Sequence, residues 1–157
     1  MNNVTKQIKE LLESMNFNYK LLEHEPTPTS QIAAKVRGTS ESQGAKAIVL
    51  RSRGKFLICV LPGNRKIDLA KMRAVIGEKS LSMATPDEVL KATGCVVGGV
   101  PPFGNLFSIP VYLDKSMLKN DEIAFNAGVQ TASIVMKSED YVKAVKPIIE
   151  EFSMTMS

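Results

Sequence analysis

Hydrophobic residues recur along the chain at two spacings, which predict its helices and strands. Val4, Ile8, Leu12 and Met15 repeat at the three-to-four-residue interval of an amphipathic helix. Shorter apolar or alternating runs, separated by Gly, Pro and Asn, are typical of strands instead. We expect strands over residues 19–23, 45–50, 56–61, 81–84, 109–113, 123–125 and 131–136.

Capping residues mark the later helices. Thr85, Pro86 and Glu88 combine an N-cap, a proline at the first helical position and a capping-box glutamate, so a helix should run from there to about Gly94. Similar signals predict helices over residues 30–37 and 69–76, each followed by glycine. A final helix is expected from Ser138, its N-cap, with Ile148 and Ile149 facing inward and a kink at Pro147.

The order of these elements mixes hairpins with crossover helices, which favours a mixed α/β fold. We expect a curved, mixed and largely antiparallel sheet approaching a barrel, with helices packed on it. The 157 residues, 44% of them hydrophobic, suit one domain over 1–157. No apolar run is long enough to span a membrane, and no signal-peptide pattern is seen, so we expect a soluble, cytoplasmic protein without membrane contact.

Charge is unevenly distributed. The chain carries +4 overall, but between residues 51 and 79 eight basic residues face only two acidic ones, giving +6 for that segment. Such a band suits a polyanion such as RNA, although a solvated surface is an equally good interpretation of the charges alone. The candidate contacts to nucleic acid are Arg51, Arg53, Arg65 and Lys66.

The segment Gly98-Gly99-Val100-Pro101-Pro102 has the composition of a binding loop. Its glycines allow a ligand to approach the main chain closely, and its prolines stiffen the segment and remove two amide donors. The remaining N–H groups could bind a carbonyl, carboxylate or phosphate. A plain connection between two strands is the alternative interpretation.

Lys46 is the exception in an otherwise apolar strand. Alternation places it on the same side as Ile48 and Leu50, so its stem should follow buried surface before the ammonium reaches a cavity or the sheet margin. A lysine in this position needs a partner, which favours a functional role over simple snorkelling into solvent.

Familiar catalytic motifs are missing. The sequence contains no nucleophile elbow, Walker loop, dinucleotide fingerprint or zinc-ligand spacing, so we expect no metal and no cofactor. The single histidine, His24, has no local Cys or Ser partner, and it could line a pocket or brace its proline-rich loop. A second small-residue loop, Asn126-Ala127-Gly128, could lie beside the first.

Four segments together resemble the YbaK/EbsC family, whose members are similar to the editing domain of bacterial prolyl-tRNA synthetases. They are Gly44–Leu50, Leu61–Leu69, Ala84–Glu88 and Thr93–Gly104, in the order found in that family. The resemblance extends over essentially the whole chain and implies a sheet curled toward a barrel.

The resemblance also implies an activity, the hydrolysis of mischarged aminoacyl-tRNA in trans. Lys46 corresponds to the family's functional lysine, expected near the tRNA 3′ end, and Gly98 to Pro102 correspond to its glycine-x-x-x-proline loop. Asn126-Ala127-Gly128 lies where many members carry His or another polar residue before a small-residue turn, so the edited amino acid stays open. An aminoacyl ester is already activated, and positioning water or a ribose hydroxyl and stabilising the oxyanion could suffice for hydrolysis.

The main hypothesis is therefore a deacylase that acts on tRNA carrying a small amino acid, with the proline tRNA as one candidate, as a monomer or weak homodimer. An aminoacyl-tRNA synthetase is a candidate partner. The alternatives are a non-catalytic module of the same fold that binds a nucleotide or aminoacyl ligand, and a regulatory protein whose basic band contacts other RNA or DNA.

Overall fold

The computed structural model describes residues 2–156 as an alternation of short helices and strands. The α-helices are α1 (Asn3–Ser14), α2 (Ser30–Arg37), α3 (Leu69–Ile76), α4 (Pro86–Thr93) and α5 (Ser138–Val145). Short 3₁₀ turns are η1 (Glu41–Gln43), η2 (Gly104–Leu106) and η3 (Lys115–Lys119). The strands are β1 (Tyr19–Glu23), β2 (Ala45–Ser52), β3 (Lys55–Pro62), β4 (Arg65–Ile67), β5 (Ser82–Met83), β6 (Val111–Asp114), β7 (Glu122–Asn126), β8 (Ala132–Lys137), β9 (Ile148–Glu150) and β10 (Ser153–Thr155).

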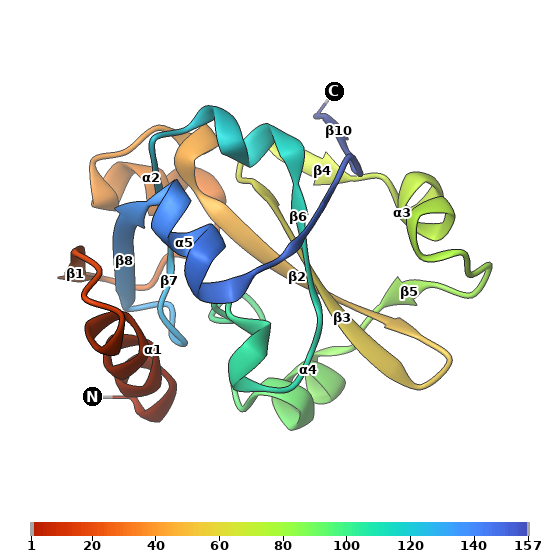
Figure 1. Ribbon diagram of the computed structural model, residues 1–157, viewed down its shortest axis with the longest axis horizontal. Coiled ribbons are helices and arrows are strands. Elements are labelled where there is room, and N and C mark those ends of the chain that lie inside the picture. Colours follow the sequence, from red (N-terminus) through yellow and green to blue (C-terminus); the bar gives the residue numbers. More distant parts are fainter. Residues whose placement is uncertain (1, 157) are drawn as a thin grey trace.

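These strands form three sheets. The largest has the order β5-β2-β3-β6-β9, in which β2 and β3 make an antiparallel hairpin while β6 runs parallel to both β3 and β9. A second, antiparallel sheet has the order β1-β8-β7, and β4 pairs with β10 in the third. Figure 1 shows the two larger sheets side by side, with the long β2–β3 hairpin crossing the molecule. The predicted mixed α/β fold is confirmed, although its sheets do not close into one barrel.

Local signals explain where most helices begin and end. Thr85 and Glu88 form the predicted capping box at the start of α4. Gly38, Gly77 and Gly94 end α2, α3 and α4 in the left-handed conformation, which glycine adopts without strain. The predictions for these helices are confirmed.

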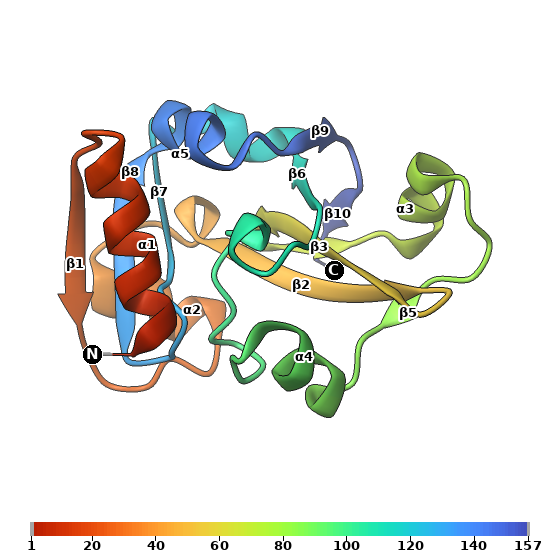
Figure 2. The same ribbon diagram turned by 60° about the horizontal axis from the view of Figure 1, so that its bottom comes forward.

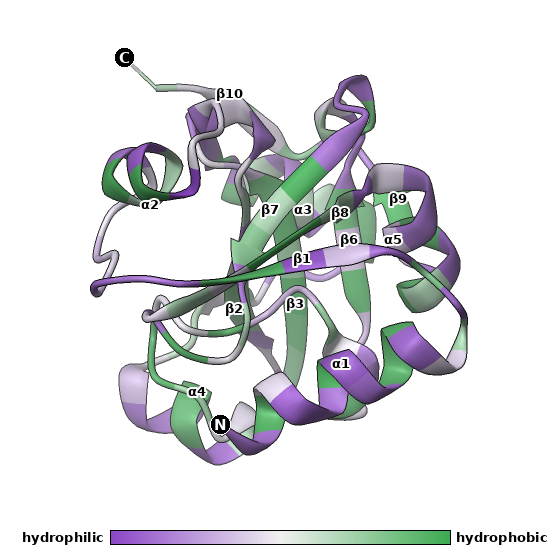
Figure 3. Ribbon diagram, turned by 90° about the vertical axis from the view of Figure 1, so that its left-hand side faces the viewer, coloured by the Kyte–Doolittle hydropathy of each residue, from purple (hydrophilic) through white to green (hydrophobic). Residues whose placement is uncertain are grey.

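Two hydrophobic clusters cover both faces of the β2–β3 hairpin. Val49 and Ile58 belong to the larger cluster, which also includes Ile8 of α1 and Phe125 of β7. Leu50 belongs to the smaller cluster, which forms around Met72 of α3 and Phe152. Figure 2 shows α1 beside the three-stranded sheet and α4 next to β2, and Figure 3 shows the mixed hydropathy of α1. The apolar character of β2 on both faces follows from this double cover.

The C-terminal segment differs from the prediction. Residues 148–150 form strand β9, parallel to β6, and not the end of a kinked helix. Because Pro147 has no amide proton and Lys146 adopts a left-handed φ of 53°, α5 stops at Val145. Ile148 and Ile149 are exposed, and Lys137, not Ser138, is the N-cap residue. The helix prediction beyond Val145 was therefore wrong.

No helix within residues 2–156 is long and apolar enough to cross a membrane.

Candidate functional site

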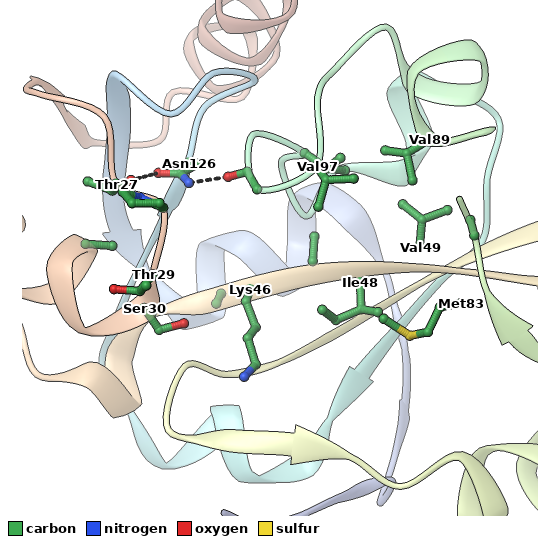
Figure 4. A pocket seen from close by; sticks show the side chains of 18 of the residues that line it. Thr27, Thr29, Ser30, Lys46, Ile48, Val49, Met83, Val89, Val97 and Asn126 are labelled. Carbon is green, nitrogen blue, oxygen red and sulfur yellow. Dashed lines mark hydrogen bonds between the residues drawn. The ribbon is translucent and has the colours of Figure 1, made fainter. Parts of the chain in front are cut away.

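A cavity of about 270 Å³ lies along one edge of β2, between α2, α4 and the loop that follows α4. Lys46, Gly98, Val100 and Asn126 all line it, although they come from three separate parts of the chain. Figure 4 shows Asn126 and Val97 on one side of β2 and the Lys46 stem leaving on the other. Within the described residues, two side chains of this lining carry positive charge, those of Lys46 and Arg37, and none carries negative charge.

Lys46 is half-buried and finds its partner in the main chain. Its Nζ donates to the carbonyl oxygen of Gly63, in the β3–β4 turn, at 3.3 Å. Burial lowers the pKa of Lys46, while the nearby negative charge of Glu41 acts in the opposite direction. The ammonium therefore sits at the cavity rim with one hydrogen bond, and its other two protons can bind a ligand oxygen.

β2 has an open edge where it borders the cavity. On this side β5 pairs only with Leu50 and Arg51. The N–H of Ala84 donates to the carbonyl oxygen of Val49 at 3.0 Å, and because peptide groups alternate along a strand, those of Ala47 point to the same edge. Ala47 therefore presents a main-chain N–H and C=O toward the cavity.

The glycine-proline loop is held at both ends. The amide Nε2 of Gln130 donates to the carbonyl oxygen of Val97 at 3.2 Å, and the buried hydroxyl of Tyr141 donates to that of Pro102 at 2.6 Å. The Phe103 ring packs edge-on against Tyr141, with 5.5 Å between ring centroids. These contacts tie both ends of the loop to the rest of the fold, so that it forms one wall of the cavity.

Only part of this loop reaches the cavity. The N–H of Gly99 donates to the carbonyl oxygen of Val96 at 2.9 Å, and a Cβ on Gly99 would lie 3.2 Å from the Cα of Val129. Gly99 is thus buried between the two loops, and its amide is already engaged. Of the predicted loop residues, Gly98 and Val100 line the cavity, whereas Gly99, Pro101 and Pro102 are buried behind it.

Asn126, at the end of β7, joins the two loops. Its Oδ1 accepts a hydrogen bond from Nη2 of Arg37 at 2.9 Å, and its Nδ2 donates to the carbonyl oxygen of Gly98. Arg37 also donates from Nε to Oγ of Ser133 at 2.8 Å. Burial lowers the pKa of Arg37 to about 10, so the guanidinium stays charged at neutral pH.

The other residues predicted for the substrate site lie around this cavity without lining it. His24 contacts Oγ of Ser133 through Nε2 at 2.7 Å, and it borders a separate hollow next to α1. The carbonyl oxygen of Ala127 accepts from the Thr5 hydroxyl, and Gly128, with a φ of 97°, packs against Val4. Ala127 and Gly128 thus attach α1 to the β7–β8 loop.

The four predicted RNA contacts occupy two places. Arg51 and Arg53, near the tip of the β2–β3 hairpin, pair with Glu88 at 2.6 Å and Glu78 at 3.7 Å. Arg65 lies in β4, where it donates to Oγ of Ser153 at 2.6 Å, and Lys66 beside it is exposed.

Arg65 borders a groove that gathers further positive charge from η3 and α3. The groove is also lined by Lys71, Lys115 and Lys119, with the carboxylates of Asp114 and Glu151. Asp114 is already saturated with hydrogen bonds from the protein. Sequence reasoning missed Lys115 and Lys119, because they lie outside the basic segment and join it only in the fold.

Sequence reasoning also missed Arg37 and Ser133. Arg37 looks like an ordinary basic residue in the last turn of a helix, so it carries no distinctive signal. The signal for Ser133 was absent, since a serine within an apolar strand has no distinctive pattern.

Comparison with known proteins identifies the family of this chain. The sequence profile of the aminoacyl-tRNA editing domain matches residues 24–144. The chain is 32% identical over 150 residues to the multifunctional Ser/Thr-tRNA deacylase ProXp-y of Escherichia coli (strain K12), covering 92% of this chain and 90% of that protein. It is 30% identical over 142 residues to the prolyl-tRNA editing protein ProX of Acetoanaerobium sticklandii, covering 86% of each.

A solved structure is similar over almost the same length. The crystal structure of a candidate trans-editing enzyme for prolyl tRNA synthetase matches with a TM-score of 0.87 and 26% identity, covering 98% of this chain and 99% of the other. The profile match, the two relatives and this structure all confirm the resemblance carried by the sequence segments. The chain therefore belongs to the aminoacyl-tRNA editing domain family.

Proposed function

We propose that this protein is a deacylase that acts in trans on mischarged tRNA and hydrolyses the ester bond of a small amino acid. The observation that carries the proposal is the single cavity shared by Lys46, the open edge of β2 and the glycine loop. A volume of about 270 Å³ has room for an aminoacyl group. Serine and threonine are our first candidates, because the Thr27, Thr29 and Ser30 side chains line the cavity.

The cavity offers chemistry for holding an ester. Within the described residues, no Cys, His, Asp or Glu lines it, so the lining Ser and Thr hydroxyls have no imidazole or carboxylate base beside them, and the attacking group is a water molecule that the free ribose hydroxyl of the substrate can orient. We propose that the main-chain N–H groups of Ala47 and Val100, two residues that line the cavity, stabilise the oxyanion that forms when water attacks the ester carbonyl. Collapse of this intermediate breaks the bond to the ribose oxygen, which takes up the proton released by the water.

Lys46 then acts as an electrostatic anchor for the 3′-terminal nucleotide. Its ammonium leaves β2 toward the β3–β4 turn, on the side away from Val97 and Asn126, as Figure 4 shows. This position suits contact with a phosphate or ribose oxygen of the terminal nucleotide while the aminoacyl group lies in the cavity. The anchor contributes to the rate by fixing the ester in a reactive position.

The acceptor stem would continue from Lys46 along β4 into the groove lined by Arg65, Lys71, Lys115 and Lys119. The proposal includes cytoplasmic action as a single domain, monomeric or weakly dimeric, with an aminoacyl-tRNA synthetase as a further partner. Arg51 and Arg53, which are ion-paired, contribute less than Arg65 and Lys66 in this arrangement.

Changing Lys115 and Lys119 to glutamine should weaken tRNA binding and reduce its salt dependence. Removing one phosphate contact lowers the slope of log affinity against log salt by about 1. Titrations at several salt concentrations, with Lys20→Gln on the distant β1 as the control, measure this slope. An unchanged slope in the double variant would exclude the groove from the interface.

A further inference from the structure

Arg37 is a half-buried cation whose contacts are all to neutral groups. Neither of the two ion pairs found within residues 2–156 includes it, and its hydrogen-bond partners are the side chains of Ser133 and Asn126. A charge removed from water without a counterion is costly, so a purely structural role would be served better by an uncharged side chain. The charge and the donor geometry of Arg37 therefore call for a specific explanation.

The chemistry of a guanidinium fixes the orientation of Asn126. Arginine can only donate hydrogen bonds, so its contact with Asn126 holds the amide oxygen toward Arg37. The amide NH₂ must then face the other way, and it meets the carbonyl oxygen of Gly98. Without Arg37, the two ends of this amide could exchange, and an oxygen facing the Gly98 carbonyl would repel it.

A second branch of hydrogen bonds holds Arg37 in place. Nδ1 of His24 lies 2.8 Å from the carbonyl oxygen of Glu25, which only accepts, so neutral His24 carries its proton on Nδ1. Nε2 then accepts from the hydroxyl of Ser133, whose oxygen accepts in turn from Nε of Arg37. The Ser133 hydroxyl also lies 3.4 Å from Oδ1 of Asn126, a longer contact than the one to His24. The guanidinium is thus held from β8 while it orients Asn126 on β7.

We propose that Arg37 is a positioning residue that latches the glycine loop to β7 by fixing the Asn126 side chain, and so sets the shape of the aminoacyl cavity. The latch determines the direction of the Gly98 carbonyl, and therefore the positions of the following peptide groups up to Val100. The expected effect of this latch on kcat rests on the proposed deacylase function. The structural part of the inference, the link from Arg37 to Gly98, stands without it.

A double-mutant cycle with Arg37→Met and Asn126→Ala tests the latch. We expect each variant to lower kcat for deacylation about tenfold with KM for tRNA unchanged. The double variant should be no slower than either single variant, since both changes break the same link.

Asn126→Asp provides the sharper comparison. It retains an acceptor for Arg37 but has no donor for Gly98, so it should be as slow as Asn126→Ala. Reductions that multiply to about a hundredfold, or a normal rate in Asn126→Asp, would overturn the proposal.

Hydrogen exchange of the peptide covering residues 96–103 gives a readout that does not depend on turnover. We expect the amides of Gly98 to Val100 to exchange faster in Arg37→Met and Asn126→Asp than in the wild type, while α1 keeps its protection. Unchanged exchange in both variants would overturn the latch.

A wild-type protein without deacylase activity would refute the proposed function. The hydrogen-exchange rates of the loop would still decide whether Arg37 acts through Asn126. If Arg37→Met does not fold, Arg37→Gln replaces it in the same comparison, because a glutamine amide can accept as well as donate and no longer fixes the Asn126 amide.

Discussion

Replacing Lys46 with methionine is expected to lower the rate of deacylation by about 10²-fold, because a small misplacement of the ester, caused at a distance from the chemistry, has a cost of that size. Methionine keeps most of the apolar stem, which lies along the half-buried edge of β2, so the fold should be retained. What disappears is the ammonium that holds the 3′ end of the tRNA at the cavity rim. The measurement is single-turnover release of the amino acid from mischarged tRNA.

Lys79→Met is a matched control, because Lys79 is exposed and lies in the segment after α3, outside the cavity. It should retain the wild-type rate. Circular dichroism and thermal melting of both variants separate lost chemistry from lost structure. A folded Lys46→Met protein that retained full activity would remove Lys46 from the mechanism.

Replacing Asp114 with alanine is expected to cost the most stability, about 2–4 kcal/mol, because it leaves buried main-chain amides without an acceptor. The Asp114 carboxylate accepts from the amides of Phe152 and Ser153 at 2.8 and 3.0 Å and from the hydroxyl of Ser153 at 2.8 Å. It also accepts from the amide and the hydroxyl of Ser116. Chemical denaturation measures the change in the free energy of unfolding. A change below about 1 kcal/mol would contradict this role for the carboxylate.

The same carboxylate predicts how stability depends on pH. Burial acts to raise the pKa of Asp114, but the hydrogen bonds from Phe152, Ser116 and Ser153 outweigh it, so the pKa is held below its ordinary value. A depressed pKa contributes stability that is present above the ordinary value of about 4 and is lost as the pH falls below it. Asp114→Asn should therefore show a smaller loss of stability than the wild type on acidification below about pH 4. Urea denaturation of both proteins at several pH values measures the difference.

Much of the fold could be predicted from local chemistry. The capping box of Thr85 and Glu88 and the double-sided apolar pattern of β2 depend on residues close together in the sequence, and both predictions are confirmed. The C-terminal helix was overextended, because Ile148 and Ile149 fit a helical repeat equally well. Only the parallel partner β6, distant in the sequence, decides that they form a strand.

The candidate site could be predicted in its residue types but not in its connections. The sequence indicates that Lys46 needs a partner, yet the carbonyl oxygen of Gly63 becomes that partner only through the β2–β3 register. The hydrogen bond from the N–H of Gly99 to the carbonyl oxygen of Val96 likewise depends on the geometry of the loop, which the sequence does not show. Arg37, Ser133 and Asn126 come from three elements, and only tertiary packing shows that they form one network.

The most direct measurement is the rate of amino acid release by the wild-type protein from a panel of tRNAs charged with serine, threonine, alanine, cysteine and larger amino acids. We expect release that is fastest for one or two of the small amino acids and negligible for the large ones, in keeping with the proposed function. Absence of release across the whole panel, with saturable binding of the same tRNAs, would contradict the deacylase and leave a binding module in its place.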